Sequence, residues 1–219
     1  MACCKDNTFQ RYKLERYFDF LDFDGNGKVE SKDLVLWAEK GVDNFAESGK
    51  PLTDENQAKL AKQCRLIFNI MTLFGFVGKS KESFASYFVF QSKLPGFRLI
   101  FRLLVKPIFE AADVNGDGKV SWEEFYFLIL KPVGISEEDA KIAFKIIDTN
   151  GDGSISLDEY ATAIVSYFAD TEVNQYSLYY GPLEKVPENY GDSVDAMVKS
   201  VQDQFGVKHE QELGDANSM

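Results

Sequence analysis

The sequence predicts an all-α protein of four helix–loop–helix units, arranged in two pairs that form one compact body. Two observations predict this fold class. Residues 113–124 and 148–159 repeat one twelve-residue pattern of acidic, amide and glycine residues, with starting points 35 positions apart. Apolar residues flank both segments at spacings of three and four, which is the pattern of one helix face. Since each unit must bury its apolar face against a partner, we expect the units in pairs.

Both loops carry the residue types that a calcium ion requires. Oxygen-bearing side chains stand at positions 1, 3 and 5, glycine at position 6 and glutamate at position 12. Ca²⁺ takes about six to eight oxygen ligands, and glycine permits the bend that turns them inward. Position 7 contributes a backbone carbonyl, so its side chain is free to vary. The predicted ligands are Asp113, Asn115, Asp117, Lys119 and Glu124 in one loop and Asp148, Asn150, Asp152, Ser154 and Glu159 in the other.

Position 8 of each loop predicts how the two units pair. Val120 and Ile155 are β-branched residues, which suit a short antiparallel bridge between neighbouring loops. Pro107 is expected in the first turn of the helix that enters the first of these loops, where its missing N–H is no loss. An Asp- and Gly-rich turn that binds nothing is the alternative for either loop, but two complete copies in tandem favour calcium sites.

A third copy lies near the N-terminus at residues 22–33, after a helical apolar stripe in residues 9–21. It differs from the other two at position 12, where aspartate replaces glutamate. Because the arm is one methylene shorter, it reaches the ion less easily with both oxygens, which favours six-coordination and competition by Mg²⁺. A solvated acidic turn is the alternative, although only one position departs from the pattern. The predicted ligands are Asp22, Asp24, Asn26, Lys28 and Asp33.

Residues 54–92 are expected to supply the partner of this first unit. Two apolar stripes at helical spacing flank residues 75–82, which contain one carboxylate and two lysines where a cation site needs several acids. We therefore expect a degenerate unit that keeps its packing and binds no metal. Residues 93–106 follow, with three basic residues at four-residue spacing, and are interpreted as a linker helix. A membrane-binding or partner-binding helix is the alternative.

The composition excludes several classes of function. The formal net charge of −11 argues against nucleic acid as a partner. No apolar run is long enough for a transmembrane segment, and we expect no leader, because no basic-then-apolar segment opens the sequence. Cys3, Cys4 and Cys64 form no disulfide framework, so a cytoplasmic location is expected. Acylation of the adjacent Cys3 and Cys4 is the alternative to an unmodified tail.

The order of active, degenerate, active and active loops resembles the invertebrate sarcoplasmic calcium-binding proteins of the EF-hand superfamily. The stretch from Tyr17 to Asp24 and the aromatic-Gly-Pro-Leu segment ending at Leu183 are similar to that family too. Calexcitin, coelenterazine-binding proteins and calcium-triggered photoproteins are related to it. The resemblance implies an N-terminal pair at residues 9–95 and a C-terminal pair at residues 96–186. Residues 187–219 extend beyond the family, and we expect a docked helix at 191–205 followed by a mobile end.

The resemblance leaves two functions open. The first is a cytosolic Ca²⁺/Mg²⁺ buffer with three sites and an optional sensor role, monomeric and not an enzyme. Only four methionines are present, whereas sensors open a methionine-rich groove to a target protein. The alternative is a Ca²⁺-regulated carrier of an apolar small molecule, because 31 aromatic residues could line a cavity. Photoprotein chemistry is disfavoured, since the single histidine, His209, lies in the polar tail.

Overall fold

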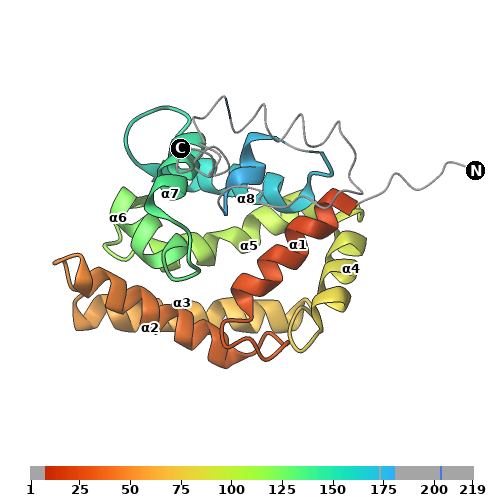
Figure 1. Cartoon of the computed structure of the whole chain (residues 1–219), viewed down its shortest axis with the longest axis horizontal. Helices are drawn as coiled ribbons and strands as arrows, with labels where there is room; N and C mark the ends of the chain where they lie inside the picture. Colours follow the sequence, from red (N-terminus) through yellow and green to blue (C-terminus); the bar gives the residue numbers. More distant parts are fainter. Residues whose placement is uncertain (1–7, 173, 181–202, 204–219) are drawn as a thin grey trace, which may run out of the picture.

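The computed structural model describes residues 8–172, 174–180 and 203, and helices make up most of this part (Figure 1). The four helix–loop–helix units within it are α1 (Thr8–Leu21) with α2 (Ser31–Glu47), α3 (Asp54–Leu73) with α4 (Lys81–Ser92), α5 (Phe97–Ala112) with α6 (Trp122–Glu124) and the π-helix η1 (Phe125–Leu130), and α7 (Glu137–Ile147) with α8 (Leu157–Ala169). The 3-10 helix η2 (Gln175–Leu178) follows α8. The predicted all-α fold class is confirmed.

Serine and glutamate side chains at the ends of two loops start the helices that follow. Ser121 and Ser156 each accept a hydrogen bond from the N–H three residues later, and the glutamate at that position accepts one from the serine N–H. This capping box satisfies N–H groups that a helix end leaves without partners. The two glutamates are Glu124 and Glu159, so the residue that closes each predicted calcium loop also starts the exit helix.

The predicted bridge between the C-terminal loops is confirmed. Strand β1 (Lys119–Val120) pairs antiparallel with β2 (Ile155–Ser156), and Val120 lies opposite Ile155 in the register. Both position-8 side chains are fully buried. The N-terminal loops are joined more sparsely, by a hydrogen bond from the Gly78 N–H to the carbonyl of Val29 at 3.2 Å. Val29 is position 8 of the first loop, so the same position makes the contact in both pairs.

The exit helix of the third unit has π geometry, which its sequence explains. The N–H of Lys131 donates to the carbonyl of Tyr126, five residues back, at 2.8 Å. Pro132 comes next, and in an α-helix its ring would clash with the carbonyl four residues earlier. A wider π-turn relieves that clash. Pro132 has no N–H to donate to the carbonyl of Phe127, five residues back. That carbonyl instead accepts a hydrogen bond from the buried side-chain amide of Asn44 in α2 at 3.3 Å.

Pro107 corrects one expectation. It lies inside α5 rather than in a first turn, because the predicted linker and the entering helix form one continuous helix from Phe97. The helix starts after Gly96, whose φ of +82° suits a residue without a Cβ. Packing of α5 against both α3 and α8 outweighs the hydrogen bond that Pro107 cannot donate.

Within the described residues, no helix combines the length and apolarity needed to cross a membrane.

Aromatic rings fill the core between α1, α4, α5 and α8. Phe88 of α4 packs against Phe101 of α5 and Phe168 of α8, with ring centroids 5.5 and 5.2 Å apart. Tyr180, after η2, adds its ring to this cluster at 5.5 Å from Tyr17. The first part of the predicted C-terminal ending is therefore packed on the core. The Gly-Pro-Leu residues 181–183, the extension 187–219 apart from residue 203, and the N-terminal cysteines lie outside the described residues.

Besides the aromatic core, two further contacts join the two predicted pairs. Helix α2 lies on η1, where Leu128 is so close to Gly41 that an added Cβ would meet its Cδ2 at 3.2 Å. Helix α3 lies on α5, and the ammonium of Lys59 donates to the backbone carbonyl of Asp113 at 2.5 Å. Figure 1 shows α2 and α3 together along one edge of the molecule, with α5 crossing its middle.

Candidate metal centres

The loop at residues 113–124 gathers its predicted side-chain ligands around its own backbone. The Oδ1 atom of Asp113 accepts from the N–H of Asp117 at 3.2 Å, and its Oδ2 accepts from Gly118 at 3.1 Å. The Oδ1 atom of Asn115 also accepts from Asp117, at 2.8 Å. Glu124 reaches back across the loop, where its Oε1 accepts from the N–H of Asn115 at 3.3 Å. Side-chain oxygens from positions 1, 3 and 12 thus all bond to backbone N–H groups within residues 113–124.

The loop at residues 148–159 repeats this arrangement. Asp148 accepts from Asp152 at 3.1 Å and from Gly153 at 2.9 Å, and the Oε1 of Glu159 accepts from the Asn150 N–H at 3.3 Å. Gly118 and Gly153, at position 6 of the two loops, have φ near +84° and +82°. These are left-handed values that favour glycine. Two loops of different sequence therefore reach one geometry, because the residues at the ligand positions are the shared ones.

The loop at residues 22–33 brings three carboxylates together. One oxygen from each of Asp22, Asp24 and Asp33 lies within 4.8 Å of the others, which is the spacing of ligands around a single ion. Asp33 accepts from the backbone N–H of Asp24 at 3.1 Å and of Glu30 at 2.7 Å, so it spans the loop as glutamate does in the other two. The Oδ1 atom of Asp22 is buried and has no hydrogen-bond partner.

These donor sets fit a divalent cation. Carboxylate, amide and backbone carbonyl oxygens are the ligands that Ca²⁺ and Mg²⁺ prefer. A buried carboxylate oxygen without a partner, as at Asp22, costs free energy that a bound cation would offset. Asp22, Asp24, Asn26 and Asp33 would hold an ion in the first loop together with the carbonyl of Lys28, and the equivalent positions would hold one in each C-terminal loop. Each ion would order its loop by drawing these oxygens together.

Lysine side chains contact two of the predicted ligands, which the sequence pattern did not indicate. The ammonium of Lys119 lies 3.0 Å from Oδ2 of Asp152 in the neighbouring loop, and that of Lys32 lies 3.1 Å from Oδ2 of Asp24. Hydrogen bonds from Ser154 and Lys119 lower the pKa of Asp152 to about 2. The hydrogen bond from Lys32 lowers the pKa of Asp24. The antiparallel bridge explains the first contact, since it places Lys119 against the next loop.

The segment between α3 and α4 offers no comparable set of oxygens among the described residues. Its carboxylate, Glu82, is exposed and faces the Arg11 guanidinium at 3.7 Å. Lys79 lies over the ring of Tyr87 at 4.6 Å, and Lys81 pairs with Asp19 at 2.5 Å. Both lysines are engaged in these contacts, and the absence of a metal site in this unit stays a prediction.

The sequence contains a capping-box pattern that could have located two further side chains at the candidate sites, Ser121 and Ser156. Ser121 and Ser156 precede the closing glutamates by three residues, which is the capping-box pattern. Their hydroxyls donate to the Oε2 atoms of Glu124 and Glu159 at 2.8 and 2.7 Å. Each hydroxyl therefore holds a predicted metal ligand in place without being a predicted ligand itself.

Comparisons with known proteins agree with this geometry. Residues 104–165 match the family model of the EF-hand domain pair. The chain is similar to the calcium-loaded apo form of coelenterazine-binding protein from Renilla muelleri, with a TM-score of 0.71 and 21% identity over 80% of this chain and 96% of that one. A calcium-binding protein from Streptomyces coelicolor gives a TM-score of 0.55 and 22% identity, covering 73% and 98%. Calcium-loaded apo-aequorin from Aequorea victoria gives 0.50 and 18%, covering 72% and 89%. No curated protein sequence matches the chain.

The fold and the loops define the class as all-α helix–loop–helix proteins with calcium-type loops. Residues 104–165 are an EF-hand domain pair, and they contain both C-terminal loops. The predicted resemblance to the EF-hand superfamily is thereby confirmed, and the fold is shared with a coelenterazine-binding protein and a photoprotein.

Proposed function

We propose that the protein binds three divalent cations and acts as a cytosolic Ca²⁺/Mg²⁺ buffer. The observations that carry the proposal are the three clustered carboxylates of the first loop and, in each C-terminal loop, carboxylate and amide oxygens that make matching hydrogen bonds to the loop backbone. Asp113 and Asp148 hold equivalent places in the C-terminal loops, and Asp22 does so in the first. The first loop takes Mg²⁺ as well as Ca²⁺, because Asp33 is shorter than glutamate.

The core favours a buffer over a sensor. Sensor proteins of this class expose a methionine-rich groove when they bind calcium. Met71 is the one methionine among the described residues, and the core there is built mainly from aromatic, branched aliphatic and alanine side chains. Tyr179 and Tyr180 are buried against this core, so the segment after α8 covers it. A core covered in this way holds its helices in one arrangement while the loops load and release ions.

The net charge, the free thiol and the residue types at the candidate sites support a cytosolic, non-catalytic role. The net charge of −11 raises the local concentration of cations and repels nucleic acid. Cys64 is a free thiol, as expected in a reducing cytoplasm. The clustered side chains at the candidate sites are metal ligands rather than a nucleophile with its base, so we propose a role without catalysis, carried out by a monomer.

Native mass spectrometry tests the stoichiometry. Three Ca²⁺ per chain are expected at saturation, and Asp22→Ala, Asp113→Ala and Asp148→Ala should each remove one. Glu82→Ala is the matched control, because it deletes a carboxylate beside the loop that we expect to bind nothing. Four specific ions, two ions at saturation, or a loss in the control would contradict the assignment of sites.

A further inference from the structure

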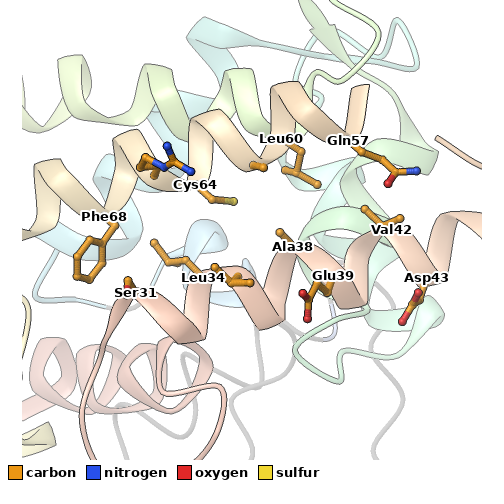
Figure 2. A pocket seen from close by; sticks show the side chains of 13 residues that line it. Ser31, Leu34, Ala38, Glu39, Val42, Asp43, Gln57, Leu60, Cys64 and Phe68 are labelled. Atoms are coloured by element: carbon orange, nitrogen blue, oxygen red, sulfur yellow. The ribbon is translucent and has the colours of Figure 1, made fainter. Parts of the chain in front are cut away.

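A groove of about 540 Å³ lies between α2 and α3, and one end of it is lined by Ser31, which belongs to the first predicted metal loop (Figure 2). Its floor is apolar: Leu34 projects from α2, and Leu60 and Cys64 project from α3. All three side chains are buried. The volume falls in the range of about 300–1,000 Å³ that small-molecule sites occupy. The shape and lining therefore suit the apolar body of a small molecule.

The α2 wall of the groove carries two carboxylates without partners. Glu39 and Asp43 both line the groove and are exposed. Eleven ion pairs occur among the described residues, and neither carboxylate takes part in one. The two lie four residues apart on one helix, where like charges repel and destabilise the helix. A positive group between them would relieve this repulsion.

The α3 wall differs in charge. Gln57 offers an amide at the same end as Val42 and Asp43, as Figure 2 shows, and Arg65 follows Cys64 along the helix. The isolated guanidinium suits an anion, whereas the paired carboxylates suit a cation. Two like charges on one wall outweigh a single charge on the other, so the groove as a whole favours a cationic group.

We propose that the groove between α2 and α3 binds a small amphipathic cation. Its apolar body lies on Leu34, Leu60 and Cys64, and its ammonium lies beside Glu39 and Asp43. Glu39 and Asp43 are not predicted metal ligands, so the proposal does not depend on the proposed buffer function. The alternative occupants, a neutral apolar molecule and an amphipathic anion attracted to Arg65, are separated by the experiment below.

Three probes that share a naphthyl group and differ in charge test which charge the groove prefers. Calorimetric titration of the calcium-saturated full chain with 2-naphthylethylamine, 2-naphthylethanol and 2-naphthylacetate should show the amine binding about tenfold more tightly than the other two. The double variant Glu39→Gln/Asp43→Asn should reduce the affinity for the amine to that for the alcohol. Equal binding of all three probes, tighter binding of the acetate, or an unchanged affinity in the double variant would overturn the proposal.

A pair of matched variants decides the location. Ala61 lines the groove and is exposed, whereas Ala58 is exposed on the same helix but does not line it. Ala61→Phe should fill the groove and weaken amine binding at least about tenfold, whereas Ala58→Phe should leave it unchanged. Both variants should keep the helical circular dichroism and the cation stoichiometry of the parent. Equal effects of the two substitutions would place the amine elsewhere.

Cys64 supplies an independent readout on the floor of the groove. Burial raises the pKa of its thiol to about 12, so a neutral maleimide should modify it slowly. In a Cys3→Ser/Cys4→Ser background Cys64 is the remaining cysteine of the sequence. Saturating amine should slow its modification several-fold, and the Ala61→Phe variant should abolish this protection. Modification at the same rate with and without the amine would contradict binding over Cys64.

Discussion

At the scale of single residues, the candidate sites depend on side chains that serve two purposes. Glu124 and Glu159 each span a loop with one oxygen and cap a helix with the other. Asp33 makes the same two kinds of contact with a shorter arm. A carboxylate oxygen has enough lone pairs to accept an N–H and bind an ion at once, so these contacts hold the position-12 side chain in place for binding.

The length of the arm at position 12 leads to one prediction. Asp33→Glu should raise the Ca²⁺ affinity of the first loop and weaken competition by Mg²⁺, because the longer arm supplies two oxygens to the ion. The amide of Gly27 donates to Asp22 at 2.8 Å, so its nuclear magnetic resonance signal reports on this loop alone. The amide of Gly153, which donates to Asp148, is the control and should titrate as before. An unchanged Gly27 titration would show that arm length is not decisive.

The contact between Lys119 and Asp152 leads to a second prediction. An ammonium 3.0 Å from a ligand oxygen competes with the ion for that oxygen. Lys119→Met should therefore raise the Ca²⁺ affinity of residues 148–159 by at most about fivefold, since the pair is exposed and screened by solvent. The carbonyl of residue 119 is unaffected by the change. Site-resolved resonance titration measures the effect, with Lys141→Met, whose ammonium pairs with Glu137 instead, as control. A weaker site in Lys119→Met would refute the competition.

At the scale of elements, the junction between α2 and η1 shows how one unit adapts to another. Pro132 ends the third unit's exit helix in a π-turn, which leaves the Phe127 carbonyl without a partner in its own helix. Asn44 supplies that partner from α2, and Gly41 lets Leu128 approach the helix backbone. The irregular helix and the helix that packs on it are therefore complementary at two positions.

This junction predicts the effect of removing the amide. Asn44→Ala should lower the free energy of unfolding by about 0.5–1.5 kcal/mol, because the partly buried Phe127 carbonyl loses its hydrogen bond. Lys40→Ala, at an exposed position of the same helix, should change it by less than about 0.5 kcal/mol. Chemical denaturation of the calcium-saturated proteins measures both. Equal stabilities would mean that water or another donor serves the carbonyl.

At the scale of the whole molecule, a buried lysine joins α1 to the end of α8. The Lys13 side chain is fully buried, its ammonium donates to the carbonyl of Asp170 at 3.0 Å, and it faces the rings of Phe9 and Tyr167. Tyr167 donates in return to the Lys13 carbonyl at 3.2 Å. Burial lowers the pKa of Lys13 from 10.5 to about 7.

The lowered pKa predicts a dependence of stability on pH. Between pH 7 and 10.5 the unfolded chain binds a proton at Lys13 that the folded chain lacks, so the free energy of unfolding rises with pH. Below pH 7 both states are protonated, and the full cost of the buried charge remains. We expect a rise of about 1 kcal/mol between pH 7 and pH 8, below the pKa of 9.0 at which Cys64 titrates in the unfolded chain. Denaturation across this range measures it, and Lys13→Met should be nearly flat. Parallel curves for the two proteins would contradict the buried titration.

The sequence by itself determined the loops and the fold class. The predicted ligands, such as Asp113 and Asp148, follow from a local pattern, since twelve consecutive residues contain each whole candidate site. The bridge between Val120 and Ile155 was predictable for the same reason, as both residues hold one fixed place in their loops.

Only the tertiary structure decided how the units meet. The continuous helix through Pro107, the partner that Asn44 gives to η1, and the burial of Lys13 all depend on surfaces distant in sequence. So do the contact of Lys119 with the next loop and the groove between α2 and α3. Periodicity shows which face of a helix is buried, but the neighbour on that face is chosen by packing of the whole chain, which local sequence does not encode.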